Sequence, residues 1–177
     1  MQRNSDDVRV TLQIWVDADA CPYEIKEMLY RAAERGQVQV TLVANQSLRT
    51  PPSPWINSVL VPGGMNIADR RIVELVGPGD LVITADIPLA ADVVAKGAEA
   101  LDPRGELYTA ANVGERHAMR NMVDEMRGAG QVMRGPSGFT ARNRQEFANQ
   151  LDRWLARVKK LTPLKSPGPD SKEQTGS

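Results

Sequence analysis

The chain has 177 residues, with 22 Lys+Arg, 22 Asp+Glu, one His and one Cys. One cysteine cannot form an internal disulfide, and no apolar run has the length of a signal peptide or a membrane span. Secreted disulfide scaffolds and membrane proteins are thereby excluded, and a cytoplasmic location is expected.

The zero formal net charge hides an asymmetry along the chain. Residues 1–102 hold 9 basic and 14 acidic residues, whereas residues 103–165 hold 12 basic and 6 acidic residues. An acidic half joined to an arginine-rich half suggests a metal site beside a surface that binds phosphate. Arginines that merely solvate two C-terminal helices would give the same balance.

Strand and helix patterns alternate along the first two thirds of the chain. Short apolar runs are followed by apolar residues at helical spacing, which is the pattern of repeated βα units. These units predict an α/β fold with an open, mostly parallel sheet and helices on both faces. The expected strands cover residues 12–16, 38–43, 58–61, 81–84 and 98–101, and the expected helices begin near Pro22, after Gly63-Gly64 and near Pro88.

The rest of the chain is expected to be helical, with a glycine-rich loop at residues 128–138 between two helices. We interpret the methionine-rich stripe of the first helix as core filler. The polar segments 1–10 and 162–177 are expected to be disordered tails, which leaves residues 11–161 as a single domain. The two apolar stripes consist of Met119, Met122, Val123 and Met126, and of Phe147, Leu151, Leu155 and Val158.

Acidic and amide side chains follow several of the expected strands. Asp17 and Asp19 follow the first strand, Asn45 the second and Asp86 the fourth, while Asp69 lies in the helix after the glycine pair. Ligands of open parallel sheets bind beyond the carboxyl ends of the strands, so these side chains are expected to converge. Their oxygen ligands favour Mg²⁺ or Mn²⁺, which can activate water for phosphodiester hydrolysis. The alternative is that Asp17 and Asp86 only cap the helices that follow them.

Several longer motifs resemble one bacterial family. They are residues 17–22 (DADACP), 43–49 (VANQSLR), 79–90 (GDLVITADIPLA) and 102–106 (DPRGE). On these motifs the chain, over about residues 12–158, is identified as a member of the uncharacterised YaiI/YqxD family, which is assigned to the PIN-like nuclease superfamily. The resemblance implies a PIN-like fold and an acidic cluster that holds divalent metal and cleaves RNA.

The resemblance also implies a role for each acid. Asp17 corresponds to the acid of the first strand, Asp69 to the helix acid and Asp86 to the acid of the later strand. Asp17 and Asp86 would bind the metal directly, and Asp69 would be a ligand or would orient water as a base. Asp19 and Asn45 would support them.

One position departs from the family pattern. The family commonly has Asp where this chain has Asn66, which can offer a carbonyl oxygen but carries no charge and so weakens a second metal position. Arg49 and Arg104, in loops after two strands, are candidate phosphate or RNA contacts, or partners of local carboxylates. We interpret Cys21 as a small buried residue at a helix start and His117 as a helix-surface residue.

The resulting hypothesis is a ribonuclease that depends on Mg²⁺ or Mn²⁺ and acts on RNA, with a homo-oligomer through the C-terminal helices left open. The first alternative is a non-catalytic RNA- or nucleotide-binding module, which Asn66 allows. The second is a phosphatase of the haloacid-dehalogenase type with Asp17 as nucleophile. We rank it lower, because Lys96 lies at the far end of its expected helix and Asp80 precedes its strand.

Overall fold

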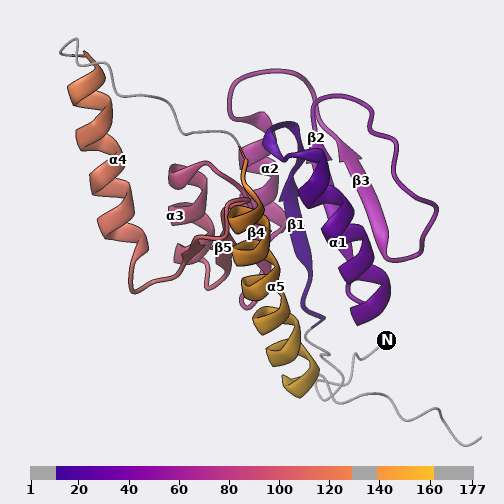
Figure 1. Cartoon of the computed structure of the whole chain (residues 1–177). Helices are drawn as coiled ribbons and strands as arrows, with labels where there is room; N and C mark the ends of the chain where they lie inside the picture. Colours follow the sequence, from indigo (N-terminus) through magenta and orange to yellow (C-terminus); the bar gives the residue numbers. More distant parts are fainter. Residues whose placement is uncertain (1–10, 129–138, 162–177) are drawn as a thin grey trace, which may run out of the picture.

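The computed structural model describes residues 11–128 and 139–161 (Figure 1). The predicted tails and most of the glycine-rich loop lie outside these residues. A six-stranded sheet has the order β3-β2-β1-β4-β5-β6, and its strands are parallel except for β6, which is antiparallel to β5. The strands are β1 (Ile14–Asp17), β2 (Val40–Ala44), β3 (Ile56–Leu60), β4 (Leu81–Ile83), β5 (Glu99–Leu101) and β6 (Leu107–Tyr108). The helices are a 3₁₀ turn η2 (Ala18–Ala20), α1 (Tyr23–Gly36), α2 (Ile67–Leu75), α3 (Ile87–Ala95), α4 (Val113–Gly128) and α5 (Ala141–Leu161).

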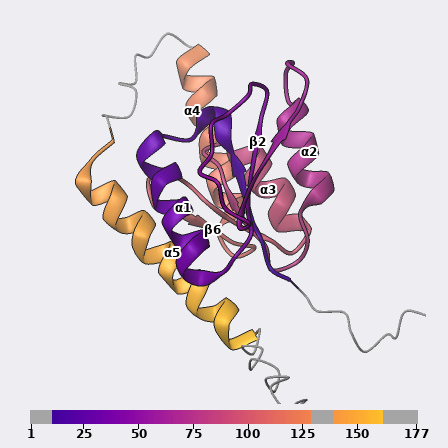
Figure 2. The same ribbon diagram turned by 90° about the vertical axis from the view of Figure 1, so that its right-hand side faces the viewer.

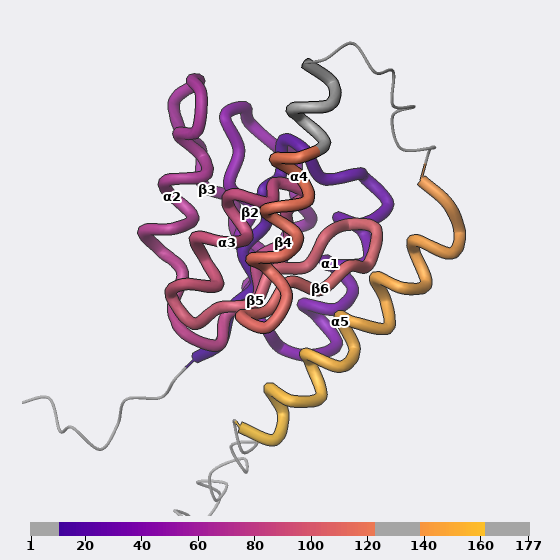
Figure 3. Tube along the Cα trace, turned by 90° about the vertical axis from the view of Figure 1, so that its left-hand side faces the viewer, coloured from indigo at the N-terminus to yellow at the C-terminus, as the bar shows by residue number. Residues whose placement is uncertain are grey.

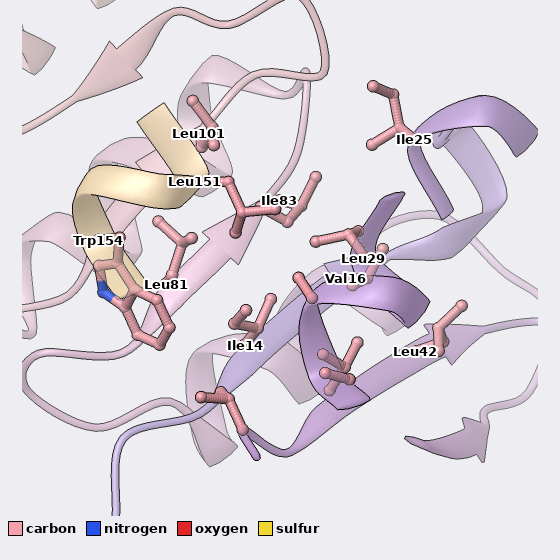
Figure 4. Packing of buried hydrophobic residues seen from close by; sticks show 14 of the residues in the cluster. Ile14, Val16, Ile25, Leu29, Leu42, Leu81, Ile83, Leu101, Leu151 and Trp154 are labelled. Carbon is pink, nitrogen blue, oxygen red and sulfur yellow. The ribbon is translucent and has the colours of Figure 1, made fainter. Parts of the chain in front are cut away.

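The two faces of the sheet are covered by different helices, because successive strand residues point to opposite faces. Ile14 and Val16 pack with α1 and α5, whereas Trp15 between them packs with α2 and α3. Figures 2 and 3 show these two helical layers on opposite sides of the sheet. Figure 4 shows the first layer from close by, with Leu151 and Trp154 of α5 packed over the strands.

The strand order creates a switch point at the centre of the sheet. From β1 the chain continues to β2 and β3 on one side, and it then crosses to β4 and β5 on the other. Ile14 of β1 therefore pairs with Val40 of β2 and with Leu81 of β4. The carboxyl ends of β1 and β4 meet where the order reverses, which is where open α/β sheets bind ligands.

Part of the arginine excess of the C-terminal half holds α5 in place. Arg144 pairs with Glu24 of α1 at 2.8 Å, and Arg157 pairs with Glu99 of β5, also at 2.8 Å. These residues lie 120 and 58 positions apart in the sequence. The basic side chains of α5 are thus used in part to join the last helix to the domain.

The predicted α/β class, the mostly parallel sheet, the helices on both faces and the helical C-terminal part are confirmed, and the architecture is compatible with a PIN-like fold. The two-residue strand β6 was not predicted, since a run so short leaves no alternation to detect. Gln37 takes the left-handed position that ends α1, with φ 51°.

The interpretation of the methionine stripe as core filler is wrong for Met119 and Met122. Their exposed fractions are 48% and 51%. The reason is the position of α4, which packs against α3 at the edge of the fold and not over the sheet (Figure 1). Amphipathic spacing predicted the helix correctly, but it could not show that these two side chains would stay half exposed. The side chains of Val123 and Met126 lie outside the described residues.

Candidate functional site

Asp17 is the last residue of β1 and is buried, which is unusual for a carboxylate. Its Oδ2 accepts a hydrogen bond from the Thr84 hydroxyl at 3.1 Å. Burial raises the pKa of Asp17, the Thr84 hydrogen bond opposes this, and the charges of Asp86 and Asp19 raise the pKa further. Asp17 makes no side-chain capping hydrogen bond, so the structure does not support the interpretation of this residue as a helix cap.

Asp86 follows β4 and is joined to Asp17 through Thr84. The Asp86 backbone N–H donates to the Thr84 hydroxyl at 3.0 Å, so this hydroxyl connects the ends of the two central strands. Asp86 Oδ1 accepts from the Leu89 backbone N–H at 3.1 Å and caps α3. The cap interpretation is therefore correct for Asp86. A capping carboxylate has a second oxygen, so the cap and a ligand role are compatible.

Asp69 lies in the first turn of α2 and completes the acidic group. Its pKa is raised to about 6, first by partial burial and then by the charges of Asp86 and Asp17. A hydrogen bond with Asp86 and the charge of Asp92 add to the rise. Three acids from β1, α2 and the β4–α3 junction are therefore close enough to influence one another, as the switch point predicts.

Two of these acids, Asp69 and Asp86, line a groove of about 590 Å³ between α2 and α3. Asn66 also lines it, and Asp92 adds a further carboxylate. The complete lining is Asn66, Asp69, Arg70, Val73, Glu74, Asp86, Pro88, Leu89, Asp92 and Arg120.

Arg70, Asp92 and Arg120 were not among the predicted site residues. No local pattern marks Arg70, because adjacent positions on a helix do not share a face. Arg120 comes from α4, whose position against α3 is not written in any local pattern of the sequence.

The other predicted residues lie around this group. Exposed Asp19 accepts from the Asn45 backbone N–H at 2.9 Å, which joins the end of β1 to the end of β2. Asn66 precedes α2 in a left-handed conformation with φ 64°, and its side chain makes no cap. Arg49 and Arg104 are exposed and do not line the groove.

Arg104 belongs instead to a turn beyond β5. Its backbone N–H donates to Asp102 Oδ1 at 2.7 Å. Burial raises the pKa of Asp102, and the backbone hydrogen bond and charge of Arg104 oppose that rise. The local carboxylate considered as an alternative partner of Arg104 is therefore beside it.

The donor chemistry of the site suits a hard divalent cation, since the candidate ligands are carboxylate oxygens. Burial raises the pKa of Asp69 first and the charges of Asp86 and Asp17 raise it further, and such a cation would offset the negative charge. Among the side chains that the structure describes, however, no three His, Cys, Asp or Glu residues are grouped so as to hold a metal ion. The residue types fit a metal, and three-point coordination would require side-chain movement.

The structure also places two residues that were considered for thiol reactivity and for phosphatase chemistry. Cys21 is buried, and burial raises its pKa to about 12, so the thiol is neutral and the interpretation as a small buried residue is confirmed. Lys96 ends α3, at the opposite end from Asp86, and donates to the Val73 carbonyl. Lys96 therefore lies away from the acidic group, as its place at the far end of the expected helix indicated.

The fold and the acids at its switch point define an α/β domain with an acidic site at the carboxyl edge of a parallel sheet. Residues 15–157 match the family model described as "Uncharacterized BCR, YaiI/YqxD family", and the chain belongs to this family.

The match to this chain covers almost the whole length of several relatives. A "UPF0178 protein" of Shewanella amazonensis is 61% identical over 149 residues, which is 84% of this chain and 100% of the relative. Those of Dechloromonas aromatica and Burkholderia cenocepacia are 59% and 61% identical, covering 83% and 82% of this chain and 98% and 97% of the relatives. No solved structure matches the chain. Among the described residues, no helix combines the length and apolar character needed to cross a membrane.

Proposed function

We propose that this protein is a divalent-metal-dependent ribonuclease that hydrolyses RNA phosphodiester bonds at the carboxyl edge of its sheet. The observation that carries the proposal is the grouping of Asp17, Asp69 and Asp86 at the switch point, where burial and neighbouring carboxylates raise the pKa of Asp17 and of Asp69 beside an open groove. Perturbed carboxylates in a cleft are typical of functional sites. The proposal includes a cytoplasmic location, where the one cysteine stays reduced.

The residues of the site would have different roles in this reaction. Asp17 and Asp86 would hold Mg²⁺ or Mn²⁺, which when bound lowers the pKa of water and neutralises phosphate charge. The Thr84 hydroxyl contacts both residues and fixes the Asp17 carboxylate relative to the end of β4. Asp69, when ionised, would accept a proton on a carboxylate oxygen from the attacking water. Arg70 and Arg120 line the groove and would contact phosphate oxygens.

The test is cleavage of a labelled single-stranded RNA in Mn²⁺ by the wild type, Asp17→Asn and Asp152→Asn. Asp152 pairs with Arg35 on the surface, so its substitution is the matched control. We expect the wild type and Asp152→Asn to cleave equally, and Asp17→Asn to be slower by at least about 100-fold. Cleavage by Asp17→Asn at the wild-type rate, or none by the wild type, would contradict the proposal.

A second candidate function is a non-catalytic RNA- or nucleotide-binding module. Two observations favour it: among the described residues the acids do not form a three-ligand metal group, and Asn66 is uncharged. RNA that binds the wild type and stays intact in Mn²⁺, with equal affinity for Asp17→Asn, would support this function over the ribonuclease.

A further inference from the structure

A second hollow lies on the other side of α2 from the acidic groove. It has a volume of about 380 Å³ and lies between α2 and the end of β3. Its apolar wall and floor come from the end of β3, the loop after it and the start of α2. The lining residues are Val59, Leu60, Val61, Pro62, Ile67, Arg70, Arg71 and Glu74.

The apolar side of this hollow is not explained by folding. Leu60 is 66% exposed although it is the last residue of β3 and a large aliphatic side chain. Val61 next to it is buried and closes the floor. An exposed apolar wall beside a polar groove is typical of a surface that contacts a ligand.

Arg70 joins the two hollows. Arg70 and Glu74 are i and i+4 on α2 and line both the acidic groove and the apolar hollow. Glu74 pairs with Arg71 at 3.1 Å, which neutralises these two side chains. Arg70 is exposed and has no ion pair with any residue that the structure describes, so its guanidinium can contact a ligand in either hollow.

The geometry points to a nucleotide subsite that extends across α2. We infer that the apolar hollow takes a nucleobase next to the phosphate bound in the acidic groove, with Arg70 contacting the intervening sugar-phosphate backbone. The inference rests on the proposed RNA-binding function and adds to it a base-binding surface. A nucleotide has the matching combination, because its phosphate is anionic while its base presents an uncharged planar face that can be removed from water against the aliphatic side chains of the hollow. Recognition of a base face in this way is tolerant of sequence, so the subsite would favour no particular base.

The experiment measures fluorescence anisotropy of a labelled single-stranded hexa-adenylate and of the same strand with abasic sugars, in Mn²⁺ at low temperature. A gel after each titration shows whether the strands are intact. The proteins are the wild type, Leu60→Ser, Arg70→Gln and Leu161→Ser. Leu161 is 73% exposed at the end of α5 and is the matched control. Thermal unfolding of each variant shows that the fold is unchanged.

We expect Leu60→Ser to weaken binding of the base-bearing strand by about three- to tenfold and to leave the abasic strand unaffected. Arg70→Gln should weaken both strands, and Leu161→Ser neither. Equal wild-type affinity for the two strands, or an unchanged Leu60→Ser, would overturn the base subsite alone. If the wild type bound neither strand, the proposed RNA-binding function would be overturned as well.

Discussion

Thr84 donates its hydroxyl hydrogen to Oδ2 of Asp17 over 3.1 Å, across the junction of two strands that lie 67 residues apart in sequence. The same hydroxyl accepts from the Asp86 backbone N–H, so one side chain ties together the two acids proposed to hold metal. Both Thr84 and Asp17 are buried. The position of the Asp17 carboxylate therefore depends on Thr84.

Thr84→Val removes this hydroxyl at nearly constant volume. Asp17 would lose a buried hydrogen bond and the Asp86 N–H a partly buried one, and we expect the free energy of unfolding to fall by about 1–3 kcal/mol. Urea denaturation measures the loss. Thr84→Ser retains the hydroxyl and should keep most of the stability. An unchanged free energy of unfolding in Thr84→Val would show that the two hydrogen bonds do not stabilise the fold.

Asp69 should make stability depend on pH. Its pKa in the folded protein is raised from 3.8 to about 6, so the folded state binds the proton more tightly than the unfolded state. The contribution of Asp69 to the free energy of unfolding is fully present below about pH 4 and is lost as the pH rises through 6. Asp69→Asn carries no charge at this position, so its free energy of unfolding should rise relative to that of the wild type between pH 4 and 8. After allowance for solvent screening the gain is about 1 kcal/mol.

Urea titrations at several pH values in EDTA would follow this difference. Asp152→Asn is the control, because its carboxylate lies on the surface in a pair with Arg35. If the free energies of unfolding of the wild type and Asp69→Asn changed in parallel with pH, the pKa of Asp69 would not be raised in the folded protein.

Asp80 illustrates an acid whose role is structural. It is buried at the start of β4, at the opposite edge of the sheet from the acidic site. It accepts from the Gln13 and Gly77 backbone N–H groups at 3.0 and 2.9 Å and from Trp15 Nε1 at 2.9 Å. Asp80→Ala leaves three donors without an acceptor and should cost about 3 kcal/mol or more.

Asp80→Asn retains one carbonyl oxygen and should lose less stability than Asp80→Ala in the same urea measurement. Neither substitution should alter Mn²⁺ binding in the fraction that stays folded. A large loss of metal affinity in folded Asp80→Asn would mean that the two edges of the sheet are coupled.

Cys21 should be unreactive in the folded protein. Its pKa is raised to about 12 by burial, so almost no thiolate exists at pH 8. A chromogenic disulfide reagent should therefore react with no thiol in buffer and with one in urea. Rapid modification without denaturant would show that the thiol is accessible and ionised.

The sequence predicted the features that depend on neighbouring residues. Strand patterns located Asp17 and Asp86 at strand ends, and parallel topology then required these ends to meet. The hydrogen bonds from Thr84 to Asp17 and from Trp15 to Asp80 could not be predicted, because they join residues more than 60 positions apart. Arg120 enters the groove only because α4 packs against α3. The exposure of Met119 depends on that same packing, so amphipathic spacing alone led to the wrong prediction.

The central claim is that the acids at the switch point bind a divalent metal, and calorimetric titration of Mn²⁺ into the wild type and Asp17→Asn tests it most directly. Because the Asp17 carboxylate is buried beside other acids, the neutral variant should stay folded. We predict saturable binding to the wild type and its loss in Asp17→Asn, with Asp152→Asn unchanged. Equal binding by folded Asp17→Asn, or no binding by any of the three proteins, would contradict the claim.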